Sequence, residues 1–356
     1  MKTFIRSSAC ISPQKTFGNQ GLLPEVISYN EIRLKAIEPD YSLFIDPKLI
    51  RRMSHIIKMG VAAGQECMNQ GNTNMPGAII IGTALGCLGD TVTFLTRLIE
   101  LNEELLPPTA FIQSTHNTVG AQIALMLKCH QYNNTFVHKG ISFESALLDA
   151  MMLLKEKEAD NILVGGIDEM TDASFAILNR LGLFKRWRVS NLSLFETNSK
   201  GTIGGEGAAF FMLTEKTSQD NLAELRGLQT FYRPADDAEI KRKIIDLLAL
   251  HSLKPENIDL VIMGKNGDPV NDKIYLHLAR SLFSKTPMAN FKHLCGEYPT
   301  AAAFALWLAS NIIKKEEIPA EVMEDSSKRM KPKKILIYNH YMNTYHSLML
   351  VTDANT

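Results

Sequence analysis

The residues best placed for chemistry surround a tight turn at Gly140. Residues 135–137 before it are β-branched or aromatic, which predicts a short buried strand. An apolar stripe at helical spacing follows over 143–154, and the run 162–164 predicts the next strand. A strand-turn-helix of this kind aims the residue at its tip at a helix N-terminus, which stabilises negative charge and is a common setting for a nucleophile.

The tip of this turn carries no group that could attack a substrate. It offers Lys139, Gly140 and Ile141, and the first hydroxyl is that of Ser142, which is also a candidate N-cap of the helix. The segment therefore predicts the backbone of a nucleophile's site without the nucleophile.

The cysteines and histidines predict neither a disulfide framework nor a metal site. The five cysteines are odd in number and lack C-x-x-C spacing, which fits a reducing cytosol. The glycine-rich stretch 82–86, GTALG, lacks the Lys-Ser/Thr of a phosphate loop. Four histidines have no partner at ligand spacing and are interpreted as surface or core residues: His116, His130, His251 and His277. We predict a cytoplasmic protein with no cofactor and no metal.

Composition excludes some partners. The chain has 356 residues, 45% of them hydrophobic, and equal numbers, 38 each, of basic and acidic residues. No long-range field therefore favours nucleic acid or an anionic membrane. The basic-aromatic run 184–188, FKRWR, could bind nucleic acid or phosphate, but we interpret it as a solvated loop. The longest apolar run, 301–313, is too short to span a bilayer, and the first residues contain no apolar export segment.

Strands and helices alternate along the rest of the chain. Strands are predicted over 3–12, 78–83, 208–213 and 260–263, with a closing pair at 335–338 and 348–351. Helices are predicted over 52–68, 91–102, 116–128, 236–250, 270–283 and 300–313. Residues 25–48 and 170–199 are predicted as irregular surface segments.

Two of the predicted helices can be laid in register. Residues 116–127 match 297–308, with small residues facing each other at Gly120 and Ala301. Together with the alternation of strands and helices, this predicts an α/β protein of two related halves, 1–216 and 217–356.

Four blocks, in order and spacing, resemble one family. They are RMS at 52–54, IIIGTALGCLGDT at 79–91, the elbow followed by ADNILVGGIDE at 159–169, and SKGTIGGEGAAFFMLTE at 199–215. On these the chain resembles the β-ketoacyl-[acyl-carrier-protein] synthases of the thiolase-like superfamily over nearly its whole length. The resemblance implies a thiolase-like fold in which two related halves form a layered α-β-α-β-α architecture.

The resemblance also implies where catalysis would lie. Family enzymes use a cysteine at the elbow and two histidines that promote decarboxylation and stabilise an enolate oxygen. The cysteine position falls on Gly140, the first histidine on Gly264 and the second on Glu297, whereas Lys292 matches the family's lysine. Two glycines supply no side chain, and an ionised glutamate would oppose an enolate. The family's glycine-rich gating loop is replaced by 339–347, NHYMNTYHS.

The implied function is that of a catalytically degenerate, chain-length-factor-like subunit in fatty-acid, polyketide or aryl-polyene biosynthesis. Such a subunit would pair with an active synthase, or with itself, and would meet an acyl carrier protein. One alternative is an active acyltransferase or decarboxylase with a displaced nucleophile, Ser142 or Cys295, or with His138 as the displaced group. Another is a stand-alone protein that binds acyl chains or acyl carrier protein.

The stretch 106–115 bears on the pairing. In the family it reaches across the dimer and helps to form the end of the neighbour's acyl tunnel, and Phe111 stands at the matching aromatic position. The alternative is that Phe111 packs in its own core.

Overall fold

The fold is built on ten strands, five from each half of the chain. The computed structural model describes residues 2–18, 22–104, 106, 108–325 and 330–355. The first half contributes β1 (Phe4–Ile11), β2 (Ala78–Gly82), β3 (Tyr132–Phe136), β4 (Asn161–Asp168) and β5 (Gly207–Thr214). The second contributes β6 (Ala223–Tyr232), β7 (Leu260–Met263), β8 (Met288–Asn290), β9 (Lys334–Tyr341) and β10 (Tyr345–Thr352).

The two halves share one topology. The hydrogen-bonded order is β3-β2-β4-β5-β1-β6-β10-β9-β7-β8, so each half has the order third-second-fourth-fifth-first when its strands are numbered from its own start. The directions agree as well: the second strand is parallel to the third and fourth, and the fifth is antiparallel to the fourth and first. The halves join where β1 pairs with β6 through two residue pairs, Phe4 with Glu224 and Ile5 with Ala223. This repetition confirms the prediction of two related α/β halves.

Helices occupy matching places between the strands. The first half has α1 (Pro47–Ile50), α2 (His55–Gln70), α3 (Leu88–Glu100), α4 (Pro108–Gln113), α5 (Thr118–Leu127), α6 (Ser142–Glu156) and α7 (Asp172–Arg180). The second has α8 (Asp237–Leu250), α9 (Pro269–Ser281), α10 (Lys292–Cys295) and α11 (Ala302–Lys315). Short 3-10 segments include η2 (Lys139–Ile141), η3 (Asn191–Glu196) and η5 (Ala320–Val322).

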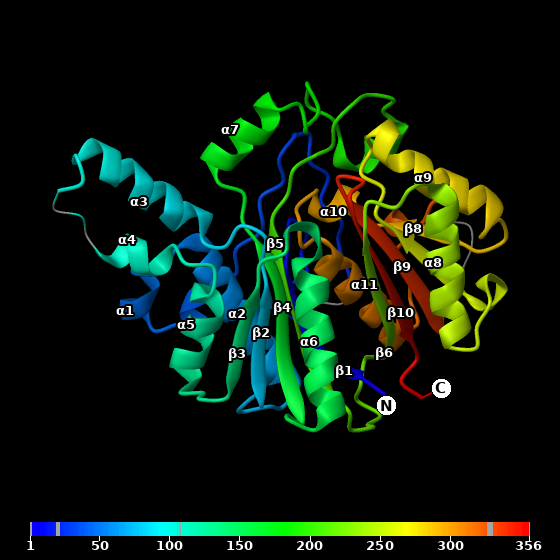
Figure 1. The fold of residues 1–356 in the computed structure, drawn as a ribbon, viewed down its shortest axis with the longest axis horizontal. Coiled ribbons are helices and arrows are strands. Elements are labelled where there is room, and N and C mark those ends of the chain that lie inside the picture. Colours follow the sequence, from blue (N-terminus) through cyan, green and yellow to red (C-terminus); the bar gives the residue numbers. More distant parts are fainter. Residues whose placement is uncertain (1, 19–21, 105, 107, 326–329, 356) are drawn as a thin grey trace.

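These elements stack in five layers (Figure 1). The apolar side chains of α6 and α11 pack between the two halves of the sheet and form one core with the strand faces turned toward them. A second core lies between the first half's strands and the helices α2 and α5. A third lies between the second half's strands and the helices α8 and α9. The order is therefore α-β-α-β-α, which confirms the implied thiolase-like architecture.

Some local predictions were wrong. Strands β6 and β8 were not predicted, and α7 lies inside the segment predicted as irregular. The sequence register between 116–127 and 297–308 is also wrong as a structural repeat. The helix α5 precedes the third strand of its half, whereas α11 follows the third strand of the other and so corresponds to α6. Small residues recur in both helices because each packs closely on its neighbours, not because the two helices are equivalent.

Candidate functional site

The strand, turn and helix of the elbow between β3 and α6 are formed as the sequence predicts, but the prediction that the strand is buried was wrong, because β3 is the edge strand and its residues are exposed or half-buried. Lys139 at its tip has a left-handed backbone with φ of 49°, a conformation that a non-glycine residue adopts at a cost. The Ser142 hydroxyl accepts a hydrogen bond from the His138 amide (2.7 Å) and donates one to the Lys139 carbonyl (2.8 Å). Ser142 is therefore the first residue of α6 and braces the turn, and the prediction that it is the N-cap was wrong. His138 follows β3 rather than lying within it.

Tyr341 occupies the space above Gly140. A Cβ atom built on Gly140 would lie 2.5 Å from the Tyr341 Cβ and 2.9 Å from its Cγ. Real Cβ atoms do not approach other carbon atoms this closely. Tyr341 is the last residue of β9, in the segment that replaces the family's gating loop. A side chain at the family's cysteine position is thus excluded unless Tyr341 moves.

The family's first histidine position is closed in the same way. A Cβ atom on Gly264 would lie 2.2 Å from Asn339 Oδ1 and 2.9 Å from the Tyr275 hydroxyl. Gly264 follows β7 and its amide donates to the Tyr338 carbonyl of β9 (3.0 Å), which fixes this close approach. An imidazole could not be placed here without displacing Asn339.

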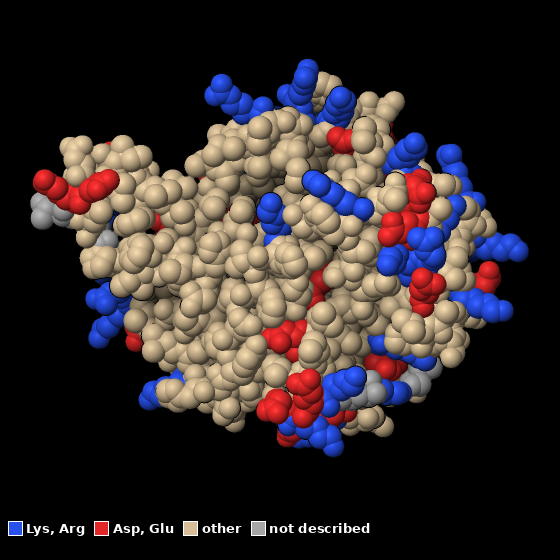
Figure 2. Space-filling model, viewed as in Figure 1, with Lys and Arg blue, Asp and Glu red and all other residues tan. Residues whose placement is uncertain are grey.

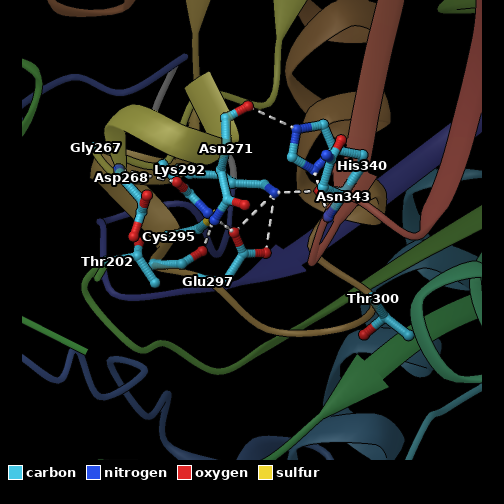
Figure 3. A network of polar contacts seen from close by, with 12 residues as sticks. Thr202, Gly267, Asp268, Asn271, Lys292, Cys295, Glu297, Thr300, His340 and Asn343 are labelled. Atoms are coloured by element: carbon cyan, nitrogen blue, oxygen red, sulfur yellow. Dashed lines mark hydrogen bonds and ion pairs between the residues drawn. The ribbon is translucent and has the colours of Figure 1, made fainter. Parts of the chain in front are cut away.

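The lysine and glutamate of the family blocks form a buried ion pair (Figure 3). Lys292 Nζ donates to both carboxylate oxygens of Glu297 at 2.9 Å and to the His340 carbonyl, also at 2.9 Å. Asn266 Nδ2 donates to Glu297 Oε2 at 2.7 Å. The Lys292 side chain is fully buried and that of Glu297 is nearly so, which makes each charge dependent on the other.

His340, whose carbonyl accepts from Lys292, has both of its ring nitrogens engaged. Nε2 lies 3.0 Å from the Asn271 carbonyl, to which it donates, and Nδ1 accepts from the Asn343 amide (3.1 Å) (Figure 3). The ring stacks on Tyr275 with centroids 4.9 Å apart. Burial, with the Lys292 and His346 charges, holds the pKa of His340 well below its usual value. It is therefore a neutral, structural residue.

Two buried carboxylates fix the loops that frame the site. Asp168 accepts from the Ala84 amide (2.8 Å) with one oxygen and from the Thr300 hydroxyl (2.9 Å) with the other. Asp272 accepts from the amides of Asn266 (2.8 Å) and Gly267 (2.9 Å). Burial raises the pKa of both carboxyls to about 6. Their oxygens are occupied by the backbone, so they position the site rather than act in it.

Glu144, in the first turn of α6, is a carboxyl of a different kind. It is fully buried, and neither of its oxygens has a hydrogen-bond partner within the described part of the chain. Burial raises its pKa from 4.5 to about 7. A protonated, neutral side chain is thus the stable form in the folded protein below neutral pH.

A cavity of about 260 Å³ remains between these groups. It is bounded by Lys139, Asn266, Glu297, Tyr341 and Met342, and further apolar and polar residues, including a second carboxyl, complete its wall. The displaced nucleophiles considered from the sequence do not line it, and Ser142 and Cys295 are both fully buried. Burial also raises the pKa of the Cys295 thiol well above its usual value, which disfavours the reactive thiolate.

Phe111 does not pack in its own core. Its side chain in α4 is 57% exposed, and its ring contacts that of Phe94 in α3 at 5.2 Å between centroids. The role at the neighbour's tunnel stays a prediction. One residue of the stretch 106–115, Pro107, lies outside the described residues.

The sequence predicted that the elbow, Gly264, Lys292 and Glu297 belong to one site. It did not predict the side chains that pack against these residues. Tyr341 and Asn339 lie in the segment that replaces the gating loop, and Asn266 follows Gly264 by two residues. For Tyr341 and Asn339 the signal was that large residues replace small ones in that segment, and Asn266 had no such signal.

Comparisons with known proteins agree with the fold. Residues 32–183 match the family model described as "Beta-ketoacyl synthase, N-terminal domain". No curated protein matches the sequence significantly.

Similar solved structures are ketosynthase proteins. The ishigamide ketosynthase/chain length factor has a TM-score of 0.82 at 15% identity, with 99% of each chain covered. The ketosynthase ApeO in complex with its chain length factor ApeC, from Xenorhabdus doucetiae, has a TM-score of 0.78 at 13% identity, covering 99% of this chain and 98% of that one. A type II polyketide complex of acyl carrier protein with its ketosynthase, AntDE:AntF, has a TM-score of 0.75 at 15% identity and 99% coverage of both.

The fold is thus that of the thiolase-like ketosynthases. The family match and these neighbours confirm the resemblance to the β-ketoacyl synthase family.

Proposed function

We propose that this chain is a non-condensing, chain-length-factor-like subunit that works as the partner of an active ketosynthase. The observation that carries the proposal is Tyr341 packed on Gly140, which leaves no room for a nucleophile at the elbow. The Lys292–Glu297 pair supports it, because the carboxylate at the second histidine position is neutralised by a buried lysine and is not free for acid-base work.

An exposed strand supports the pairing with a synthase. β3 is the last strand of the sheet on its side, and its Tyr132 is 43% exposed, with Val137 just beyond it at 47%. Apolar side chains flank it from α5 and α6: Leu125, Leu148 and Met152 are 72%, 49% and 49% exposed. An unpaired strand edge beside an apolar surface is a ready place for another chain to add its own strand.

The projecting segment of α3 and α4 adds to this surface (Figure 1). Ile99, Phe111 and Ile112 on it are 74%, 57% and 64% exposed. Three large apolar side chains on one protrusion are unfavourable in water and fit a place in a partner's interior, as the role proposed for Phe111 requires.

A basic groove supports contact with an acyl carrier protein. It has a volume of about 450 Å³ and is lined by Arg180, Arg186, Lys200 and Trp187, and it shares Phe184 with the cavity at the elbow. No acidic side chain pairs with these three cations within the described part of the chain. Figure 2 shows basic side chains along the top of the molecule, over α7 and its neighbouring loops. A carrier's prosthetic arm is attached through a phosphodiester, whose negative charge suits such a groove.

We also propose that the chain divides into the halves 1–216 and 217–356. Support comes from β5, which ends at Thr214, and β6, which begins at Ala223 with the repeat of the topology.

The test is reconstitution with a cysteine-containing ketosynthase from the same organism. Alone, the chain should neither condense nor decarboxylate malonyl-carrier substrate, and the pair should sediment as a heterodimer. A monodisperse monomer at micromolar concentration in the presence of candidate synthases would contradict the partner role. Turnover by the chain alone that is abolished by Ser142→Ala or Cys295→Ala would instead establish the displaced-nucleophile enzyme, and carrier binding without any synthase would establish the stand-alone binder.

A further inference from the structure

The free edge of β3 presents backbone groups that point away from the rest of the sheet. β3 is the last strand on its side of the described sheet, so these groups have no neighbouring strand (Figure 1). The Phe136 carbonyl points the other way, toward β2, because it accepts from the Thr83 amide just beyond the end of that strand (3.1 Å). Successive residues of a strand direct their backbone groups to opposite sides, so the Thr135 amide points to the free edge.

Asn134 bonds this edge amide with its own side chain. Its Oδ1 accepts from the Thr135 N–H at 2.8 Å. Its Nδ2 donates to the Tyr132 hydroxyl at 3.0 Å, and that hydroxyl donates to Asp149 Oδ2 of α6 at 3.1 Å. Asn134 is therefore held in place from its other end, and we call Asn134, Tyr132 and Asp149 the edge cap. A short polar side chain that bonds the backbone in this way competes with pairing to another strand.

We propose that the edge cap selects the partner of β3, favouring a strand from a different chain over a second copy of this one. A strand that joins β3 must release the Thr135 N–H from Asn134 and supply a backbone carbonyl in its place. Two identical chains pair about a twofold axis, so both caps lie in their interface and both must open. A different chain meets one cap. The pairing with a synthase rests on the proposed function, whereas the effect on self-association does not.

The number of caps gives the proposal a quantitative signature. Opening one cap exchanges a single neutral hydrogen bond for solvation, which should weaken pairing about fivefold, so two caps should weaken it about 25-fold. Removing the cap should therefore strengthen self-association by the square of the factor by which it strengthens pairing with a different chain. A substitution that merely improved the contact surface of β3 would not act on the Thr135 amide of the monomer.

The first test uses the isolated full chain. Sedimentation equilibrium compares wild type with Asn134→Ala and with Asn133→Ala, the matched control. Asn133 is the neighbouring asparagine of the same strand, and its Nδ2 donates to the Gly120 carbonyl (2.9 Å) instead of serving the edge. Asn134→Ala should self-associate about 25-fold more tightly than wild type, whereas Asn133→Ala should stay within about twofold of it.

Hydrogen exchange of the Thr135 amide reports on the cap directly. It is followed by NMR of the dilute, monomeric chain labelled with ¹⁵N-threonine. Exchange should become faster in Asn134→Ala, and also in Tyr132→Phe, because that variant removes the hydroxyl to which Asn134 donates. It should be unchanged in Asn133→Ala.

Titration against a cysteine-containing ketosynthase from the same organism completes the test. Asn134→Ala should tighten this pair about fivefold. Unchanged Thr135 exchange in Asn134→Ala, wild-type self-association as tight as that of Asn134→Ala, an equal gain in Asn133→Ala, or a gain with the synthase as large as the gain in self-association would each overturn the proposal. If no synthase binds, the proposed function fails, while the exchange and self-association of the isolated chain still decide the role of the cap.

Discussion

Restoring a side chain at Gly140 gives the sharpest test of the closed elbow. Gly140 does not have a positive φ, so an L-residue can adopt its backbone conformation. At such a position Gly→Ala ordinarily stabilises a protein by about 0.4–1 kcal/mol, because the unfolded chain loses freedom. Here the new Cβ would lie 2.5 Å from the Tyr341 Cβ. Overpacking of this kind costs about 1–3 kcal/mol. The steric cost wins, and Gly140→Ala should lower the free energy of unfolding by about 1 kcal/mol or more.

The sign should reverse once Tyr341 is truncated. In a Tyr341→Gly background the added methyl group meets neither the Cβ atom nor the ring of Tyr341, so Gly140→Ala should become neutral or stabilising. The four proteins form a double-mutant cycle, read by urea unfolding, with an expected coupling between the two sites of about 1–3 kcal/mol. A Gly140→Ala protein as stable as wild type in the presence of Tyr341 would refute the view that Tyr341 fills the elbow.

Gly140→Cys carries the same reasoning to chemistry. All five native cysteines are buried, so alkylation by iodoacetamide would report on position 140 against a low background. We expect slow alkylation in the single variant and faster alkylation when Tyr341→Gly is added. Neither should condense malonyl-carrier substrate, because no histidine stands at position 264 or 297 to promote decarboxylation. A ketoacyl product from Gly140→Cys alone would show that these positions are more competent than we infer.

Three further outcomes are expected. Lys292→Met should destabilise the fold by about 3–5 kcal/mol because it strands the buried Glu297 carboxylate, whereas adding Glu297→Met should recover most of the loss; equal destabilisation by both variants in urea unfolding would contradict this. Glu144 has a raised pKa in the fold, about 7 against an ordinary 4.5, so the native state holds a proton that the unfolded state releases as pH rises. The free energy of unfolding should therefore fall, by up to about 3 kcal/mol, as the pH rises from 4.5 to about 7. Glu144→Gln should remove this part of the pH dependence, and parallel stability–pH curves for the two proteins would contradict it. Phe111→Ala should cost the isolated chain well under the ~3–5 kcal/mol of a buried phenylalanine, since the ring is 57% exposed, while lengthening the product of the reconstituted pair. Product lengths are measured by mass spectrometry, with melting temperatures as the control for stability. An unchanged distribution of product lengths from a stable complex would refute the tunnel role.

The elements that could be predicted from the sequence are those whose pattern is local. The elbow was predictable because its strand, turn and helix each carry their own signal within 132–156. The strand β6 was missed because its buried part is short and Arg226, Gln229 and Thr230 interrupt the apolar pattern, so that pairing with β1 and β10 decides its structure. The short strand β8 has three residues and likewise depends on its pairing with β7.

The candidate site shows the same contrast between features that are local in the sequence and features that depend on tertiary packing. The empty positions Gly140 and Gly264 could be identified from spacing, because the loss of a side chain is visible in the sequence itself. That Tyr341 and Asn339 fill those positions could not, because both come from β9, far along the chain from either glycine. Tyr341 reaches Gly140 through the packing of the second half on the first, and Asn339 reaches Gly264 through the pairing of β9 with β7. Similarly, the pairing of Lys292 with Glu297 follows from the bend of the chain after α10, where Gly296 has φ of 76°.

The two-part sheet also bears on the order in which the protein can be made. Each half ends with the strand that pairs with its own first strand, so the first half can close its five strands once residue 214 has emerged from the ribosome. Its inner face, however, is covered only by α6 until α11 is synthesised about 100 residues later, and α11 packs on β1 and β5 as well as on the second half. During that interval a nascent chain exposes the apolar face of a finished sheet. Chaperones that hold such surfaces would therefore act on this protein in the middle of its translation, between the closing of one half and the arrival of the helix that seals both.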